Sequence, residues 1–109
     1  MNRDTEFATL TALHSIARLL SEGGRPVVLL PRFSFQAAGK DAQMDLLLVP
    51  WEHSGYVTRL FYERAIPERV QNWSQHVVLS RNWWAPSWNH VPATYPWREI
   101  LLAHLRAVA

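Results

Sequence analysis

Four of the chain's six tryptophans lie between residues 70 and 88, and they are Trp73, Trp83, Trp84 and Trp88. An indole buries a large apolar ring system, but its N–H needs an acceptor once it is buried. Tryptophans gathered this closely therefore form either an aromatic core or a surface that grips a protein, a base or a sugar. Core packing is the more common of the two, and the sequence leaves both interpretations open.

His76 and His90 lie in the same region, and Ser74 precedes His76 by two residues. Histidine titrates near neutral pH without any perturbation, so it is a frequent general acid or base. A histidine in an irregular segment often only hydrogen-bonds to backbone carbonyls, and this structural role competes with catalysis. A nucleophilic serine is not predicted, because a catalytic triad is defined in space and not by adjacency. His76 is the candidate catalytic residue.

Arginine supplies ten of the eleven basic residues, and Arg81 lies among the tryptophans. A guanidinium group stacks on an indole and forms forked contacts with carboxylates, so we expect Arg81 to contact an acid or a tryptophan. The candidate binding residues are Trp73, Arg81, Trp83, Trp84, Trp88 and His90.

The remaining histidines give no sign of a metal site. His14, His53 and His104 lack the i, i+2 or i, i+4 partners and the carboxylates that zinc sites use. Glu52 and His53 are adjacent, but on a turn that we expect to be exposed. His104 falls on an apolar helical stripe, where a histidine is usually a hydrogen-bonded core residue. No metal is predicted.

Composition excludes several classes of protein. The 109 residues are 49% hydrophobic and 18% charged, which is typical of one folded domain, residues 1–109. The net charge of +2 is too small for a nucleic-acid binder with a basic stripe. Cysteine is absent, which excludes disulfides, thiolate metal sites and thiol nucleophiles. The four glycines form no phosphate-binding loop, so no cofactor is predicted.

The N-terminus carries no signal-peptide pattern, and no apolar run approaches the roughly 20 residues that a membrane span needs. We therefore expect a cytoplasmic protein that does not bind membranes.

The order of elements predicts an α+β fold. Residues 5–22 have helical periodicity, with Asp4 or Thr5 as N-cap and two glycines at the end. Strands are expected over residues 26–35, 44–50 and 56–66, and they form an antiparallel meander. Residues 76–80 would add a fourth strand if they pair with this sheet. A mostly irregular, tryptophan-rich flap follows. Thr94 then caps a C-terminal helix with Pro96 in its first turn, and the helices cover one face of the sheet.

Three segments of the chain resemble bacterial relatives of ubiquitin-conjugating enzymes that are encoded beside ubiquitin-like proteins. In one branch of that family, a leucine-rich strand ends in proline, a W-x-x-W-S-x-H-like segment follows, and a W-x-P step leads into the closing helix. The corresponding residues here are Leu46, Leu47, Leu48, Val49 and Pro50, then Trp73, Ser74 and His76, then Trp84 and Pro86. The resemblance implies a ubiquitin-conjugating-like fold over most of the chain.

The chain departs from that family at the site of its chemistry. The conjugating enzymes carry ubiquitin on a cysteine, which is absent here, and Asn89-His90-Val91-Pro92 does not match their His-Pro-Asn element. The resemblance therefore implies a non-catalytic, protein-binding accessory protein of a bacterial ubiquitin-like modification or anti-phage defence system. Its partner would be a ubiquitin-like protein, the activating enzyme or another product of the same operon.

Two other classes of function remain open. A small inhibitor or immunity-type protein encoded by a phage or mobile element would use the Trp- and Arg-rich patch to bind a host protein or a toxin. A small hydrolase or transferase-like enzyme would use His76 or His90. Exposure of two or more of Trp83, Trp84 and Trp88 on one face would favour a binding surface, whereas burial would favour a core.

Overall fold

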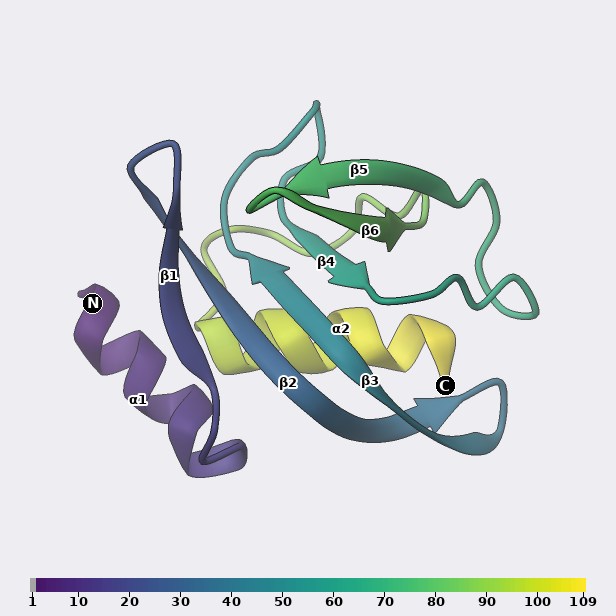
Figure 1. Cartoon of the computed structure of the whole chain (residues 1–109), viewed down its shortest axis with the longest axis horizontal. Helices are drawn as coiled ribbons and strands as arrows, with labels where there is room; N and C mark the ends of the chain where they lie inside the picture. Colours follow the sequence, from purple (N-terminus) through teal and green to yellow (C-terminus); the bar gives the residue numbers. More distant parts are fainter. Residues whose placement is uncertain (1) are drawn as a thin grey trace.

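The computed structural model describes residues 2–109 as a six-stranded sheet with one helix at each end of the chain (Figure 1). This arrangement confirms the α+β class, the N-terminal helix and the C-terminal helix. The elements in chain order are α1 (Arg3–Leu13), β1 (Arg18–Glu22), β2 (Arg25–Ala37), β3 (Lys40–Val49), β4 (Arg59–Tyr62), β5 (Ser74–Val78), β6 (Arg81–Ala85) and α2 (Trp97–Val108).

All strands pair antiparallel in the order β1-β2-β3-β4-β6-β5. The first four strands form a meander, and the hairpin β5–β6 joins it through the pairing of Tyr62 with Trp84. The prediction of three or four strands was therefore wrong in number. The third predicted strand, residues 56–66, is reduced to β4.

The predicted helix over residues 5–22 ends at Leu13, and its last five residues, Arg18–Glu22, form strand β1. The cap is Asn2, whose side chain accepts the Thr5 N–H at 2.8 Å, and not Asp4 or Thr5. Gly23 and Gly24 do not end a helix, because their φ values of +59° and +80° make the tight turn between β1 and β2. Pairing with β2 overrides a helical pattern that is only moderate, as tertiary contacts commonly do.

The tryptophan-rich segment is not an irregular flap, since much of it forms the hairpin β5–β6. Its two turn residues, Leu79 and Ser80, have φ values of +54° and +58°. Non-glycine residues rarely adopt this left-handed conformation, and neither residue type signals such a turn. The turn of this hairpin therefore had no local signature in the sequence.

The C-terminal helix keeps its predicted apolar stripe, with its buried residues at Ile100, Leu101, His104, Leu105 and Val108. Its N-cap is Pro96 and not Thr94. The buried carboxylate of Glu6 accepts the Trp97 N–H at 3.1 Å, so α1 supplies the acceptor that the cap lacks. Within residues 2–109, neither helix is long and apolar enough to cross a bilayer.

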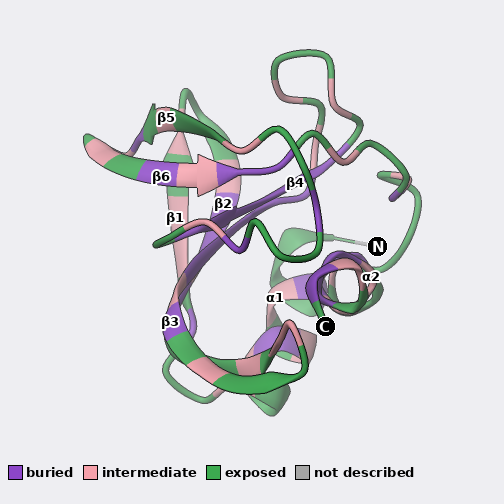
Figure 2. Cartoon of the chain, turned by 90° about the vertical axis from the view of Figure 1, so that its right-hand side faces the viewer, coloured by how far each residue is buried: buried purple, intermediate pink, exposed green. Residues whose placement is uncertain are grey.

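The sheet separates two hydrophobic cores because side chains alternate along each strand. On β3, Leu46 and Leu48 face α2 and the larger core, whereas Leu47 and Val49 face the smaller one. Figure 2 shows both helices together on one side of the bent sheet. The smaller core, called here the hairpin core, lies on the opposite face and consists of Val27, Leu47, Val49, Phe61, Val78, Trp83 and Ala85.

The bend brings the two edge strands of the sheet together at one corner. Glu22, the last residue of β1, accepts the Leu79 N–H in the β5–β6 turn at 3.2 Å. Trp51, which follows β3, donates its indole N–H to the Pro26 carbonyl at 2.7 Å. The first contact ties the β5–β6 turn to β1, and the second ties the segment after β3 to the start of β2.

Candidate binding site

The hairpin-core face carries a buried arginine at its rim. Arg59, the first residue of β4, is only 3% exposed. Its guanidinium carbon lies 3.9 Å from the ring centroid of Tyr56 and 5.7 Å from that of Phe61. Its Nη2 donates to the Pro86 carbonyl at 3.4 Å, the long limit of a hydrogen bond, while Nε and Nη1 find no acceptor among residues 2–109.

Two histidines from different elements meet beside Arg59. The rings of His53 and His76 lie 5.9 Å apart, nearly perpendicular, and both contact Phe61 edge-on at 5.2 and 5.6 Å. The Nε2 atom of His76 hydrogen-bonds to the Ser74 hydroxyl at 3.0 Å. The Nδ1 atom of His53 is buried and has no partner in the described part of the chain. We call Arg59, His53 and His76 the Arg59 cluster.

The electrostatics of the cluster favour neutral histidines. Burial lowers the pKa of both His53 and His76, and the positive charge of Arg59 lowers each further. His53 also lowers the pKa of His76, whereas Glu52 and Glu22 partly offset the shift at His53. Burial lowers the pKa of Arg59, but a guanidinium group stays charged. Near neutral pH the cluster therefore carries the charge of Arg59 alone.

Residues 51–57, called here the 51–57 loop, cover the cluster. His53 and Tyr56 exchange backbone hydrogen bonds of 2.9 and 3.0 Å, around a turn with positive φ at Ser54 and Gly55. The Tyr56 hydroxyl bonds to Ser87 at 2.8 Å. The turn is exposed at Glu52, Ser54 and Gly55, as expected, but the His53 ring is partly buried against Phe61.

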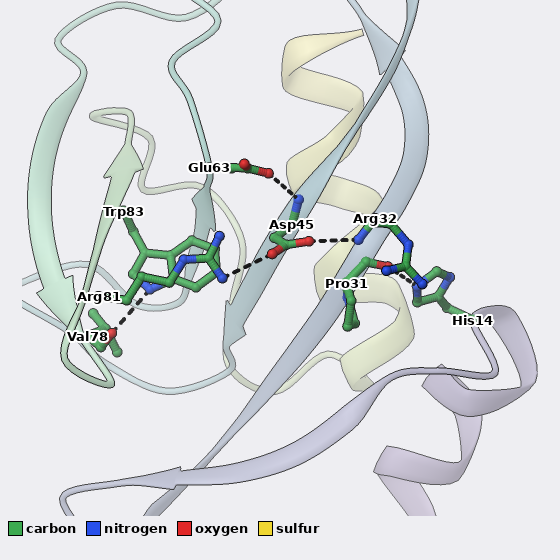
Figure 3. Close-up of polar contacts among 8 residues, drawn as sticks. All are labelled: His14, Pro31, Arg32, Asp45, Glu63, Val78, Arg81 and Trp83. Atoms are coloured by element: carbon green, nitrogen blue, oxygen red, sulfur yellow. Dashed lines mark hydrogen bonds and ion pairs between the residues drawn. The ribbon is translucent and has the colours of Figure 1, made fainter.

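The predicted site residues are divided between the two faces of the sheet. His76 and Trp83 are paired across β5 and β6 and lie on the hairpin-core face. Arg81 stacks over the Trp83 ring at 4.2 Å and forms an ion pair with Asp45 at 3.0 Å (Figure 3). Arg81 thus makes both kinds of contact that its sequence neighbours suggested.

The other predicted binding residues lie toward the helices. Trp73 packs edge-on against Tyr62 at 5.2 Å, and Trp88 packs against His90 at 4.7 Å. Trp84 shares the face of Tyr62, its partner across β4 and β6.

None of the tryptophans discussed as a surface is exposed. Trp83 is 1% exposed, while Trp73, Trp84 and Trp88 are partly buried. The indole N–H groups of Trp73 and Trp83 donate to the Val70 and Val78 carbonyls. These observations favour the core interpretation of the aromatic cluster.

The Ser74–His76 contact lacks the third member of a catalytic arrangement. Among residues 2–109, no carboxylate hydrogen-bonds to His76, and the neighbouring His53 meets it through ring contact only. A general base needs such an orienting group to hold its tautomer. The described residues also contain no group of three or more side chains that could hold a metal ion.

Asp45 connects the hairpin to an irregularity in β2 (Figure 3). Its carboxylate accepts the Arg32 N–H at 2.8 Å, where β2 shifts register and Arg32 has a φ of +48°, and its own N–H donates to Glu63 at 2.9 Å. Burial tends to raise the pKa of Asp45, but the Arg32 N–H and the Arg81 side chain outweigh it and hold that pKa below its usual value.

Replacing Asp45 by Ala is expected to lower the free energy of unfolding by about 1–2 kcal/mol, because the Arg32 N–H and Arg81 both lose their acceptor. Arg81→Met removes the partly exposed ion pair and the stacking on the Trp83 ring, and together these losses should cost less than about 1 kcal/mol. Urea unfolding at neutral pH measures both values. Equal losses in the two variants would show that the Arg32 contact contributes nothing.

Sequence reasoning missed Arg59 and His53. The available signal was a single charge inside the strand RLFY, all four residues of which are buried. Comparison of the chain with protein-family models, curated proteins and solved structures finds no match.

Proposed function

We propose that this chain is a non-catalytic protein-binding domain with a ubiquitin-conjugating-like fold. It acts in the cytoplasm as an accessory protein of a bacterial ubiquitin-like modification or anti-phage defence system. The order of helix, meander, aromatic segment and closing helix supports this proposal. The leucine run ends at Pro50 directly after β3, and Ser74 and His76 lie in β5, directly after Trp73. Without a cysteine the chain forms no thioester, so it acts by contact.

The observation that carries a protein-binding role is the open edge of β5. This strand is last in the sheet order, and within residues 2–109 it pairs only with β6. Its sequence, SQHVV, contains no Lys, Asp, Glu or Pro, and Val77 is 68% exposed. Proteins normally protect an edge strand with charges, prolines or bulges. The opposite edge strand, β1, follows that rule, with Arg18 and Glu22 at its ends.

An unprotected edge accepts an extended segment of a partner as an additional strand. Backbone hydrogen bonds would supply affinity, and side chains on alternate faces of β5 would supply specificity. Val77 would contact the added strand on one face of β5. His76, which belongs to the Arg59 cluster, would contact it on the other face.

Capture from the native host tests this proposal with a matched pair of variants. The wild-type chain is expected to retain a ubiquitin-like protein or its activating enzyme, identified by mass spectrometry. Val77→Lys should reduce recovery at least about tenfold, because a charge on the edge opposes strand addition. Ile16→Lys, a change at an equally apolar residue that is 44% exposed but outside the edge, should leave recovery unchanged.

Equal recovery with Val77→Lys and the wild type would contradict the role of the β5 edge. Recovery of a toxin or of a host enzyme, in place of components of a modification system, would favour the inhibitor or immunity-type function.

A further inference from the structure

Three arginines on the hairpin side of the sheet, Arg25, Arg59 and Arg81, stack on aromatic rings, and among residues 2–109 only Arg81 has a counterion. Arg81 lies 4.2 Å from the Trp83 ring and pairs with Asp45. Arg59 lies 3.9 Å from the Tyr56 ring, is far more buried, and has no carboxylate within ion-pair distance among residues 2–109. An unpaired buried charge is strongly destabilising, so Arg59 needs an explanation that its protein neighbours do not provide.

The unused donors of Arg59 are arranged for an anion with several oxygens. Among the described residues, the Nε–H and both Nη1–H groups find no acceptor, and Nη2 has only the long contact to Pro86. A guanidinium fork fits the paired oxygens of a carboxylate or phosphate and forms its strongest hydrogen bonds with them. The unused N–H groups of Arg59 therefore indicate that the missing partner is an anion with paired oxygens, such as a carboxylate or a phosphate.

Within residues 2–109, two histidine rings and no free acid lie beside Arg59. The buried Nδ1 of His53 has no partner in the part of the chain that the structure describes, and His76 contacts both His53 and Phe61. The nearest acids that influence His53 are Glu52 and Glu22. Glu52 accepts the Gly55 N–H at 2.8 Å, and Glu22 accepts the Leu79 N–H at 3.2 Å, so both carboxylates are engaged elsewhere.

We propose that Arg59, His53 and His76 form a binding site for one oxyanion, either inorganic phosphate or the carboxylate of a bound peptide. Arg59 binds the oxygens through its fork, and the two histidines complete the ring of donors. The 51–57 loop supplies both His53 and the Tyr56 ring that covers Arg59, so this loop shifts to admit the anion. The site does not depend on the proposed accessory function, because it follows from the charge balance of the fold.

The first experiment titrates the wild-type chain with inorganic phosphate and separately with acetate, at constant ionic strength and pH 6. The expected result is a saturable shift of the Arg59 Nε–H signal and of the His53 and His76 ring signals in NMR spectra, with one dissociation constant for all three. The proposal would be overturned if neither phosphate nor acetate produced a saturable shift.

A short extended peptide distinguishes the two sources of the anion. A free C-terminal carboxylate that binds at least about tenfold more tightly than the amidated peptide assigns the site to a peptide terminus. Binding of phosphate with no difference between the two peptides assigns it to free phosphate.

Arg59→Met and Arg81→Met are matched variants that separate this site from general electrostatics. Arg59→Met removes an unpaired buried charge, so it should raise the unfolding temperature without anion by about 5 °C and abolish the response to phosphate. Arg81→Met should lower the unfolding temperature and keep that response, because Arg81 is already paired with Asp45. If Arg59→Met fails to fold, Arg59→Lys should fold and lose about tenfold in anion affinity.

Two further results would overturn the proposal. The first is an unchanged phosphate response in Arg59→Met or Arg59→Lys, which would place the anion elsewhere. The second is a phosphate response that appears only in Glu52→Gln, since Glu52 would then serve as the counterion of Arg59 in solution.

Discussion

Trp83→Ala is expected to lower the free energy of unfolding by about 3–5 kcal/mol. The Trp83 side chain is 1% exposed and is the largest in the hairpin core. Its removal leaves a cavity between β6 and the rest of the sheet, and it also removes the indole hydrogen bond to the Val78 carbonyl at 3.2 Å. A domain of this size is stable by only about 5–15 kcal/mol, so this one change removes a large share of its stability.

Trp84→Ala is the matched control, because Trp84 is the next residue in the same strand and belongs to neither core. Its side chain is only partly buried, so we expect a loss of about 1 kcal/mol. Urea denaturation followed by circular dichroism gives both values. If the two losses are equal, the hairpin core does not contribute to stability as its burial indicates.

Lowering the pH from 7 to 4 is expected to destabilise the fold through His104 by about 3 kcal/mol. Burial, and then the charge of Arg59, lower the pKa of His104 to about 4, from about 6.5 in the unfolded chain. Between these two values the unfolded chain binds more protons than the folded chain, so stability falls as the pH falls through this window. Below pH 4 this contribution is fully lost and the slope due to His104 ends.

The hydrogen bonds of Thr58 explain why His104 is held neutral. The Thr58 hydroxyl donates to the Val91 carbonyl at 2.8 Å, so its oxygen accepts from the Nε2–H of His104 at 2.9 Å. This contact fixes the neutral Nε2–H tautomer inside the larger core, where a second proton on the ring would be buried without a counterion.

Stability measured by urea denaturation between pH 4 and 7 tests this account. His104→Leu should lose most of the pH dependence, and a smaller slope of the same sign should remain from His53 and His76, whose pKa values are also lowered. His90→Ala changes an exposed histidine and should keep the wild-type slope. An unchanged slope in His104→Leu would mean that other groups cause the acid sensitivity.

Elements with a strong, single periodicity were predictable from the sequence. The stripe from Ile100 to Val108 defines one face of α2, and its histidine is the hydrogen-bonded core residue expected there. The apolar run from Leu46 to Val49 indicated a central strand, and β3 lies inside the sheet with all four of these residues buried. In both cases the local pattern and the tertiary packing require the same structure.

Elements whose local pattern was ambiguous were decided by pairing. Residues 18–22 have apolar positions that fit a helix or a strand, and hydrogen bonding to β2 selects the strand. The β5–β6 hairpin turns at Leu79 and Ser80, which carry no turn signature, so only its packing over the hairpin core explains it. The tryptophans that suggested a surface are what attaches this hairpin to the sheet.

The candidate site shows the same division. The sequence singled out His76 by its aromatic surroundings, but gave no reason to join it with His53 and Arg59, which are 23 and 17 residues earlier in the chain. The contact of the two histidines on Phe61 arises because the hairpin folds over β4, and this is a long-range event. The absence of an acid beside Arg59 is likewise visible only in three dimensions.

The amino-acid sequence alone determined the fold class, the presence of a helix near each end of the chain and the exclusion of thiol chemistry. Composition and short-range periodicity express these features directly. Only the tertiary structure decided that the bent sheet separates two hydrophobic cores, that the tryptophans pack inward, and that a buried arginine lies beside two histidines. Each of these depends on the burial and pairing of residues distant in sequence, which no local pattern contains.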